Sequence, residues 1–274
     1  MNKESTTKAL RIRIYQPQAH YRVPFTYQRR HTYPIPPYST VIGLLCNVLG
    51  IRNLKTQGEP KEDANYKKLK ELKISIAGRF ESKTTEYTWL RNLSKDSHII
   101  RFGSTNIREI NGHIEHIGGQ SPVLIDILSE VKLFIYLANN DEVFLKKIKT
   151  SLENPTQRLY PIHLGRAEDW IVFEEISSIF ELEYKEKIQD GNYRNFFWIP
   201  KHYVRNGQTP GLRYRVPTFY KLTNGVRNFE YEDAFLNDGK IIGLKGYFDE
   251  FEENNVKIRM PVFFSGRRDN GSTT

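Results

Sequence analysis

Residues 15–50, YQPQAHYRVPFTYQRRHTYPIPPYSTVIGLLCNVLG, decide the fold of this chain, because a loop rich in arginine and aromatic residues leads there directly into an apolar helix. Several prolines precede the helix, and Ser39 or Thr40 is expected to cap its first turn. The apolar positions between Val41 and Leu49 form one wide stripe, which Gly50 ends. The segment therefore predicts a core helix with a cationic, aromatic loop immediately before it.

A strand is predicted just before this loop, because the residues there alternate strictly. An aliphatic face opposes a polar face, namely Leu10, Ile12 and Ile14 against Arg11, Arg13 and Tyr15. One face of the strand is therefore expected to pack on the core, and the other is expected to be basic.

The remaining patterns of the first domain predict two strands, two helices and a closing strand. They are the amphipathic segment Asn65–Leu72, the strands Ile74–Phe80 and Val131–Leu137, the helix that Asp141 opens, and a strand that runs from Trp170 through Phe173. The order strand, helix, strand, arm, strand, helix, strand indicates an α+β, ferredoxin-like (split βαβ) domain, as in RNA-recognition motifs. We expect this domain to span residues 1–190 and a smaller β-rich region to span residues 191–274.

Residues 83–120 predict a long β-hairpin arm inserted in that domain. Tyr87, Trp89 and Arg91 alternate along its first strand, and a long polar stretch follows. Because a structureless loop of this length is unusual inside a compact fold, an arm used for binding is the better interpretation.

Composition favours an anionic partner and a reducing compartment. The 274 residues contain 41 Lys and Arg against 32 Asp and Glu, which gives a formal net charge of +9. The single cysteine, Cys46, excludes an intramolecular disulfide. No segment has the length and apolarity of a membrane span, and the amino-terminal residues lack the apolar core of a signal peptide. We expect a soluble, cytoplasmic protein with no membrane association.

Three segments carry a family resemblance: HYRVPF at residues 20–25, HTYPIPPYSTVIGLLCNVLG at residues 31–50, and YPIHLGRAEDW at residues 160–170. Together they resemble the CRISPR-associated proteins of family five, the RAMP-type subunits of type I Cascade surveillance complexes, with a motif style nearest to type I-B. The similarity in organisation covers roughly the first two-thirds of the chain.

The resemblance implies a non-catalytic RNA-binding subunit in antiviral defence. Such a subunit caps one end of the complex and holds the 5′ handle of the CRISPR RNA (crRNA), with the arm as a thumb. Its implied partners are crRNA, the large subunit, the backbone subunits and, through the assembled complex, target DNA. No cofactor is implied.

Recognition of single-stranded RNA requires aromatic or guanidinium planes, base-edge donors and phosphate-neutralising charge. The candidate RNA-binding residues are Tyr15, Gln16, His20, Tyr21, Arg22, Arg29, Arg30, His31, Tyr33, Ser39, Thr40, Arg91, Arg101, Arg108, Gly165, Arg166, Arg213 and Arg215. Each of them singly also fits an ordinary surface role.

Some of these candidates have a specific structural alternative. Arg166 either neutralises a phosphate that approaches Gly165 or pairs with Glu168 or Asp169. Ser39 and Thr40 fit a phosphate site and simple N-capping equally well. A second basic, aromatic cluster either extends the RNA path or meets the large subunit; it consists of Arg205, Arg213, Arg215 and Lys221 among Tyr203, Tyr214, Phe219 and Tyr220.

The alternative function is a metal-independent endoribonuclease that processes the CRISPR repeat RNA, an activity that some members of the resembled family have. Cleavage needs a base, a proton donor and a cation near the phosphorane. His20 or His31 with Tyr21 or Tyr33 would supply the first two. Seven histidines in a basic chain often place one near tyrosines by chance, so we expect binding without catalysis.

Other enzyme classes lack their motifs. The sequence has no P-loop, no GxGxxG after a strand, no CxxC pair and no HExxH. The pairs Glu168-Asp169 and Glu174-Glu175 do not suit a shared metal, because adjacent side chains on a strand point to opposite faces. We expect no metal site.

Overall fold

The computed structural model of the chain describes residues 6–52, 63–92, 109–110, 113–114, 119–205, 207–224, 226–253 and 255–266. The helices in these residues are α1 (Tyr38–Val48), α2 (Ala64–Lys70), α4 (Glu142–Glu153) and the short 3-10 helix η1 (Lys201–Tyr203). The strands up to residue 150 are β1 (Thr6–Ala19), β2 (Arg29–Arg30), β3 (Lys73–Arg79), β4 (Ser82–Asn92), β5 (Glu109–Ile110), β6 (His113–Ile114) and β7 (Gly119–Ala138). The later strands are β8 (Val172–Ile176), β9 (Phe180–Lys185), β10 (Gly191–Asn192), β11 (Phe196–Pro200), β12 (Leu212–Thr223), β13 (Val226–Asn237), β14 (Lys240–Ile241), β15 (Gly246–Glu253) and β16 (Val256–Val262).

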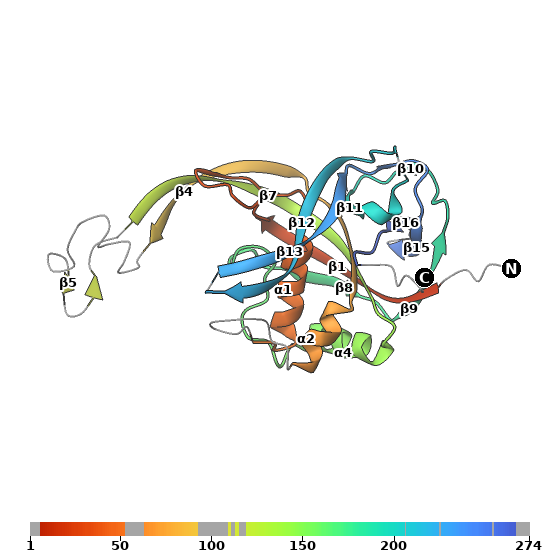
Figure 1. Cartoon of the computed structure of the whole chain (residues 1–274), viewed down its shortest axis with the longest axis horizontal. Coiled ribbons are helices and arrows are strands. Elements are labelled where there is room, and N and C mark those ends of the chain that lie inside the picture. The colour runs from red at the N-terminus through yellow and green to blue at the C-terminus, as the bar shows by residue number, and fades with distance from the viewer. Residues whose placement is uncertain are drawn as a thin grey trace.

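Twelve of these strands form one mostly antiparallel sheet, with α1, α2 and α4 gathered on one side of it (Figure 1). The strand order is β12-β13-β11-β3-β7-β1-β9-β15-β16, while β2 and β4 pair with β7 and β8 pairs with β1. β10 and β14 form a separate pair, as do β5 and β6. The α+β class expected from the sequence is confirmed.

The predicted core strands and helices lie where their periodicity places them. The aliphatic residues of β1 and of residues 131–137 in β7 are buried and pack with the apolar stripes of α1 and α4 in one cluster. Asp141 caps α4, because its carboxylate accepts a hydrogen bond from the Phe144 N–H at 3.0 Å. These two helices and the centre of the sheet therefore form the core that supports the loop after β1.

The predicted basic face of β1 is covered instead of exposed. Arg11 is buried, and its guanidinium binds Asp249 of β15 at 2.6 Å and Glu175 of β8 at 2.8 Å. Arg13 lies near Glu174 and Glu175 at 3.5 and 3.6 Å. This expectation was wrong because β8 and the C-terminal strands bring acidic side chains over that face.

Two predicted element starts are also corrected. α1 begins at Tyr38, one residue before Ser39, and Pro37 occupies the N-cap position without a side-chain hydrogen bond. Ser39 and Thr40 therefore lie inside the first turn and do not cap it. The closing strand β8 begins at Val172 and not at Trp170, which forms an isolated bridge with His163.

The arm that the sequence predicts begins as a regular antiparallel ladder. β4 pairs with β7 from Ser82 opposite Ser129 to Asn92 opposite Gly119, and the two strands extend away from the body (Figure 1). β7 passes from body to arm at Glu130, whose φ of 55° is left-handed. The β1–β7 ladder lacks a pair at this residue, and its register is the same on both sides of the gap. Most of residues 93–118, including Arg101 and Arg108, lies outside the described residues.

Strands from both sides of residue 190 belong to the large sheet. β11 pairs with β3, and β15 pairs with β9. A second apolar cluster, which includes Phe134 and Tyr136 of β7 with Phe197 and Phe263 of the C-terminal region, fills the face of the sheet opposite α1. The division of the chain into regions 1–190 and 191–274 stays a prediction.

Candidate nucleic-acid interface

The loop after β1 folds back on itself and lies along the arm. The Val23 N–H donates to the His31 carbonyl at 2.8 Å, and the Tyr33 N–H donates to the Tyr21 carbonyl at 2.8 Å. The far part of the loop forms β2, which pairs with β7 in parallel, Arg29 opposite Leu124. Backbone hydrogen bonds thus fix residues 21–33, called the arginine loop below, against the root of the arm.

Asp126 of β7 accepts hydrogen bonds from two side chains of the arginine loop. Its carboxylate is buried and accepts from Arg29 Nη2 at 3.2 Å, from Thr85 Oγ1 at 3.0 Å and from His31 Nδ1 at 3.1 Å. Burial alone would raise the pKa of Asp126, but the hydrogen bonds from His31, Thr85 and Arg29 outweigh it and leave the pKa below its ordinary value. Asp126 is therefore ionised and holds Arg29 and His31 at the surface.

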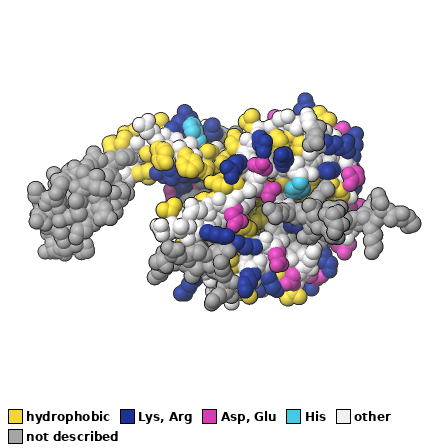
Figure 2. Space-filling view, viewed as in Figure 1, with side chains coloured by type: hydrophobic (Ala, Val, Ile, Leu, Met, Phe, Trp, Pro, Cys, Tyr) yellow, Lys and Arg dark blue, Asp and Glu magenta, His cyan; other side chains and the backbone are white. Residues whose placement is uncertain are grey.

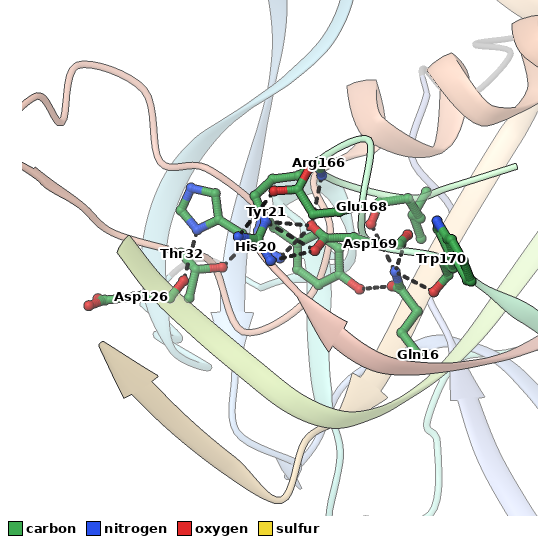
Figure 3. A network of polar contacts seen from close by, with 10 residues as sticks. Gln16, His20, Tyr21, Thr32, Asp126, Arg166, Glu168, Asp169 and Trp170 are labelled. Atoms are coloured by element: carbon green, nitrogen blue, oxygen red, sulfur yellow. Dashed lines mark hydrogen bonds and ion pairs between the residues drawn. The ribbon is translucent and has the colours of Figure 1, made fainter. Parts of the chain in front are cut away.

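A second buried carboxylate, Asp169, accepts hydrogen bonds that hold the turn containing Gly165 and Arg166 (Figure 3). It accepts from the His20 N–H at 3.0 Å, from the Arg166 N–H at 2.7 Å and from Arg166 Nη2 at 2.7 Å. Arg166 also lies 3.4 Å from Glu168. Of the two alternatives for Arg166, the structure contains the pairing with acids.

Gly165 is needed in this turn for close packing. Its φ is +115°, and a Cβ there would lie 2.7 Å from Asp169 Oδ2 and 2.9 Å from the His20 carbonyl oxygen. The space beside Gly165 is thus occupied by Asp169 and by the end of β1.

Three candidate residues turn inward. Gln16 is buried and donates from Nε2 to the Leu164 carbonyl at 2.9 Å, while its amide oxygen accepts from the Tyr21 hydroxyl. Tyr33 packs edge-on against Trp198 and Tyr214, and burial raises its pKa to about 12. Burial also raises the pKa of Tyr21 well above its ordinary value. These side chains position the loop and do not face solvent.

His20 is buried as well. Its Nδ1 lies 2.8 Å from the Asp126 carbonyl oxygen, so Nδ1 carries the proton and Nε2 has the lone pair. Among the described residues, Nε2 has no hydrogen-bond partner, and burial lowers the pKa of the ring. Of the residues proposed for catalysis, His31 alone is exposed, and the structure does not bring His20, Tyr21 and Tyr33 to a shared surface with it.

The outer face of the arm carries residues that the sequence analysis did not select. The side chains of Tyr87 and Trp89 in β4 are 62% and 51% exposed, and that of Leu124 in β7 is 40% exposed. In the space-filling view, hydrophobic side chains lie beside cationic side chains and a histidine where the arm leaves the body (Figure 2). The sequence signal that could have identified them is the alternation of Tyr87 and Trp89 along the predicted strand of the arm.

The other candidates are distributed over several environments. Arg22 is exposed and donates to the Thr26 carbonyl at 3.0 Å. Arg30 is partly buried, and burial and then the charge of Arg22 lower its pKa. The Tyr15 hydroxyl lies 3.1 Å from both carboxylate oxygens of Glu130.

The candidates farther along the chain lie on the strands β4 and β12. Arg91 belongs to β4. Arg213 pairs with Asp233 at 2.6 Å on the exposed β12–β13 hairpin. Arg215 lies 4.8 Å from the ring centre of Tyr231 on the same hairpin. The two arginines flank Tyr214, whose ring packs against Tyr33 of the arginine loop.

Within the described part of the chain, no group of three or more His, Cys, Asp or Glu side chains is arranged to hold a metal ion. The helices described there are also too short or too polar to cross a bilayer.

Comparison with known proteins identifies the family. A model of the family described as CRISPR-associated protein (Cas_Cas5) matches residues 9–271. The chain belongs to this family. The resemblance inferred from residues 20–25, 31–50 and 160–170 is thereby confirmed, and no curated protein matches the sequence significantly.

Two solved structures of CRISPR proteins align over most of this chain. A chain of a "CRISPR RNA-guided surveillance complex" has a TM-score of 0.51 and 11% identity, with 86% of this chain and 91% of that chain covered. A CRISPR protein from Archaeoglobus fulgidus has a TM-score of 0.35 and 15% identity, with 93% and 99% covered. At the identity of the first match, the likeness shows a shared fold.

Proposed function

We propose that this member of the Cas5 family holds and caps the 5′ handle of crRNA in a type I Cascade surveillance complex without cutting it. One observation carries the proposal: β2 of the arginine loop pairs with β7 of the arm, and Arg29 binds Asp126 of β7, so that exposed cations of the loop and exposed aromatic rings of β4 lie on strands that flank β7. A surface of this composition suits single-stranded RNA, whose phosphates need cations and whose bases need stacking partners.

The fold supports the same proposal. The strand order β3-β7-β1-β8, with α1 between β1 and β3 in the chain and α4 between β7 and β8, is that of the split βαβ domain found in RNA-recognition motifs. In this proposal the arm acts as the thumb. The chain contacts the large subunit and the backbone subunits, and it meets target DNA through the assembled complex.

The structure gives a reason to favour binding over cleavage. A base and a proton donor must reach the same ribose and phosphate. His20, Tyr21 and Tyr33 are buried, while the His31 ring is half exposed and held by Asp126. The processing ribonuclease remains the second candidate, with His31 as the residue that would act.

The test is a metal-free incubation of the purified chain with end-labelled repeat RNA, analysed on native and denaturing gels. We expect a retarded, intact RNA, and a weaker shift for an unrelated RNA of the same length. RNA that migrates as free on the native gel would contradict handle binding. A discrete cut that disappears in His31→Ala would instead make the chain a repeat-processing ribonuclease.

A further inference from the structure

The arm has two faces that differ in what they bury. Its inner face has a small core of its own, in which Val123, Ile125 and Ile127 pack with Leu90. The outer face presents Tyr87 and Trp89, two residues apart on β4 and therefore on the same side of the strand. Because the inner core is complete without them, these exposed rings are not required to hold the arm together.

The two rings form a defined platform. They meet edge to face, with ring centres 5.9 Å apart and planes at 88°. Tyr87 lies opposite Leu124 and Trp89 lies opposite Pro122 in the ladder with β7. The exposed rings thus border further apolar groups on a rigid pair of strands, and each ring has a large solvent-facing area.

Cations lie on the same face, toward the body. Lys83 and Thr85 precede Tyr87 at two-residue spacing, and the half-exposed Arg29 reaches across β7 to Asp126. The acidic residue of β4, Glu86, has the alternate parity and belongs to the other face. A face that carries Lys83 and Arg29 beside aromatic rings fits a phosphate chain with unstacked bases, because the cations neutralise phosphates and the rings offer flat faces to the bases.

We propose that Tyr87 and Trp89 stack on unpaired nucleobases of an RNA strand whose phosphates lie on the arginine loop. This inference rests on the proposed RNA-binding function and adds a second, uncharged contribution to it. Stacking tolerates every base, because each base has an aromatic face. The arm would therefore contribute affinity for single-stranded RNA and little sequence preference.

The experiment separates stacking from charge by measuring the affinity for repeat RNA over a series of salt concentrations. For Tyr87→Ala/Trp89→Ala we expect a loss of about five-fold to a hundred-fold at every salt concentration, with the salt slope unchanged. Tyr87→Phe/Trp89→Phe keeps two rings and should restore most of the affinity. Trp170→Ala, which removes another highly exposed ring outside the arm, is the matched control and should bind like the wild type.

Several outcomes would overturn the inference. Unchanged affinity of the double alanine variant would remove the rings from the RNA site, and a smaller salt slope would show that the variant had disturbed the cations. If that variant binds RNA normally but no longer co-purifies with another subunit, the platform binds protein. A wild-type chain that does not bind RNA would contradict the proposed function itself. Unchanged thermal unfolding of the variants would exclude misfolding as the cause of lost affinity.

Discussion

Arg11 of β1 and Arg29 at the root of the arm each bind a buried aspartate, and the two pairs differ in solvent exposure. Arg11 lies 2.6 Å from Asp249, and the two side chains are 10% and 6% exposed. Arg29 lies 3.2 Å from Asp126, and the two side chains are 50% and 1% exposed. The arginine of the pair is therefore exposed to solvent at the root of the arm and is buried between β1 and β15.

The difference shows what each arginine is available to do. The Arg11 guanidinium also binds Glu175 and lies 3.9 Å from the ring centre of Phe251, so both its charge and its flat face are occupied. Within the described residues, Arg29 pairs with the carboxylate of Asp126 alone, and half of its side chain is exposed. We infer that Arg11 joins the C-terminal strands to β1, whereas Arg29 keeps capacity for a ligand.

The largest expected effect comes from breaking the buried pair. Asp249→Ala leaves the Arg11 charge with Glu175 alone and removes the acceptor of the Tyr136 hydroxyl, which lies 3.0 Å away. We expect the free energy of unfolding, measured by urea titration, to fall by about 3–5 kcal/mol.

The matched control is Glu250→Ala at the next position of β15. Glu250 pairs with Lys257 and Arg259, and all three side chains are substantially exposed. Its removal should lower the free energy of unfolding by less than about 1 kcal/mol. Equal losses in the two variants would show that burial does not distinguish these pairs.

The turn beside the arginine loop should give the next largest effect. Gly165→Ala forces a Cβ to within 2.7 Å of Asp169 Oδ2 at a φ of +115°. We expect a loss of about 1–3 kcal/mol in the free energy of unfolding. Gly43→Ala in α1 is the control, because a Cβ there meets nothing within 4 Å and alanine favours a helix by about 0.5–1 kcal/mol. Destabilisation by both variants to the same extent would contradict the role given to this turn.

The comparison also explains which parts of the fold could be predicted from sequence. The alternation in β1 and the stripe of α1 are local patterns, and both elements lie where they were expected. The partner of Arg11 is 238 residues away in the chain, and no local pattern could reveal that β15 covers it. The expectation of a basic face failed for this reason.

In the candidate site too, local features could be predicted from the sequence and distant contacts could not. Composition located the arginine loop, and the pairing of β2 with β7 places it beside the arm. Composition did not distinguish inward from outward side chains: Tyr33 is buried because Trp198 and Tyr214, far along the chain, pack against it. Trp89 is 51% exposed, although it was not selected as a binding residue.

Arg29→Ala should separate the function of the exposed pair from its effect on stability. Thr85 and His31 still donate to Asp126 in this variant, so we expect a loss of only about 1 kcal/mol in the free energy of unfolding. The salt slope of RNA binding should fall by about one, as for one lost phosphate contact. Arg259→Ala, on the edge strand β16, is the control and should keep the wild-type slope. If Arg29→Ala also kept that slope, Arg29 would not contact phosphate.

The smallest expected effect is a pH dependence that arises where His20 contacts the backbone of Asp126. Burial and then the charge of Arg166 lower the pKa of His20 in the folded chain, against the hydrogen bond to the Asp126 carbonyl. Below the unfolded value of about 6.5 the unfolded chain binds more protons, so the free energy of unfolding falls as pH drops from 7 to 5. Asp126 does not contribute in this window, because its lowered pKa matters only below about pH 4. Urea titrations at several pH values should therefore give a smaller decrease in the free energy of unfolding for His20→Gln than for the wild type. The control is His163→Gln, which should keep the wild-type decrease. The His163 ring lies at a more exposed position, 2.9 Å from the Pro161 carbonyl oxygen. An unchanged decrease in His20→Gln would show that this buried ring is not the group that titrates.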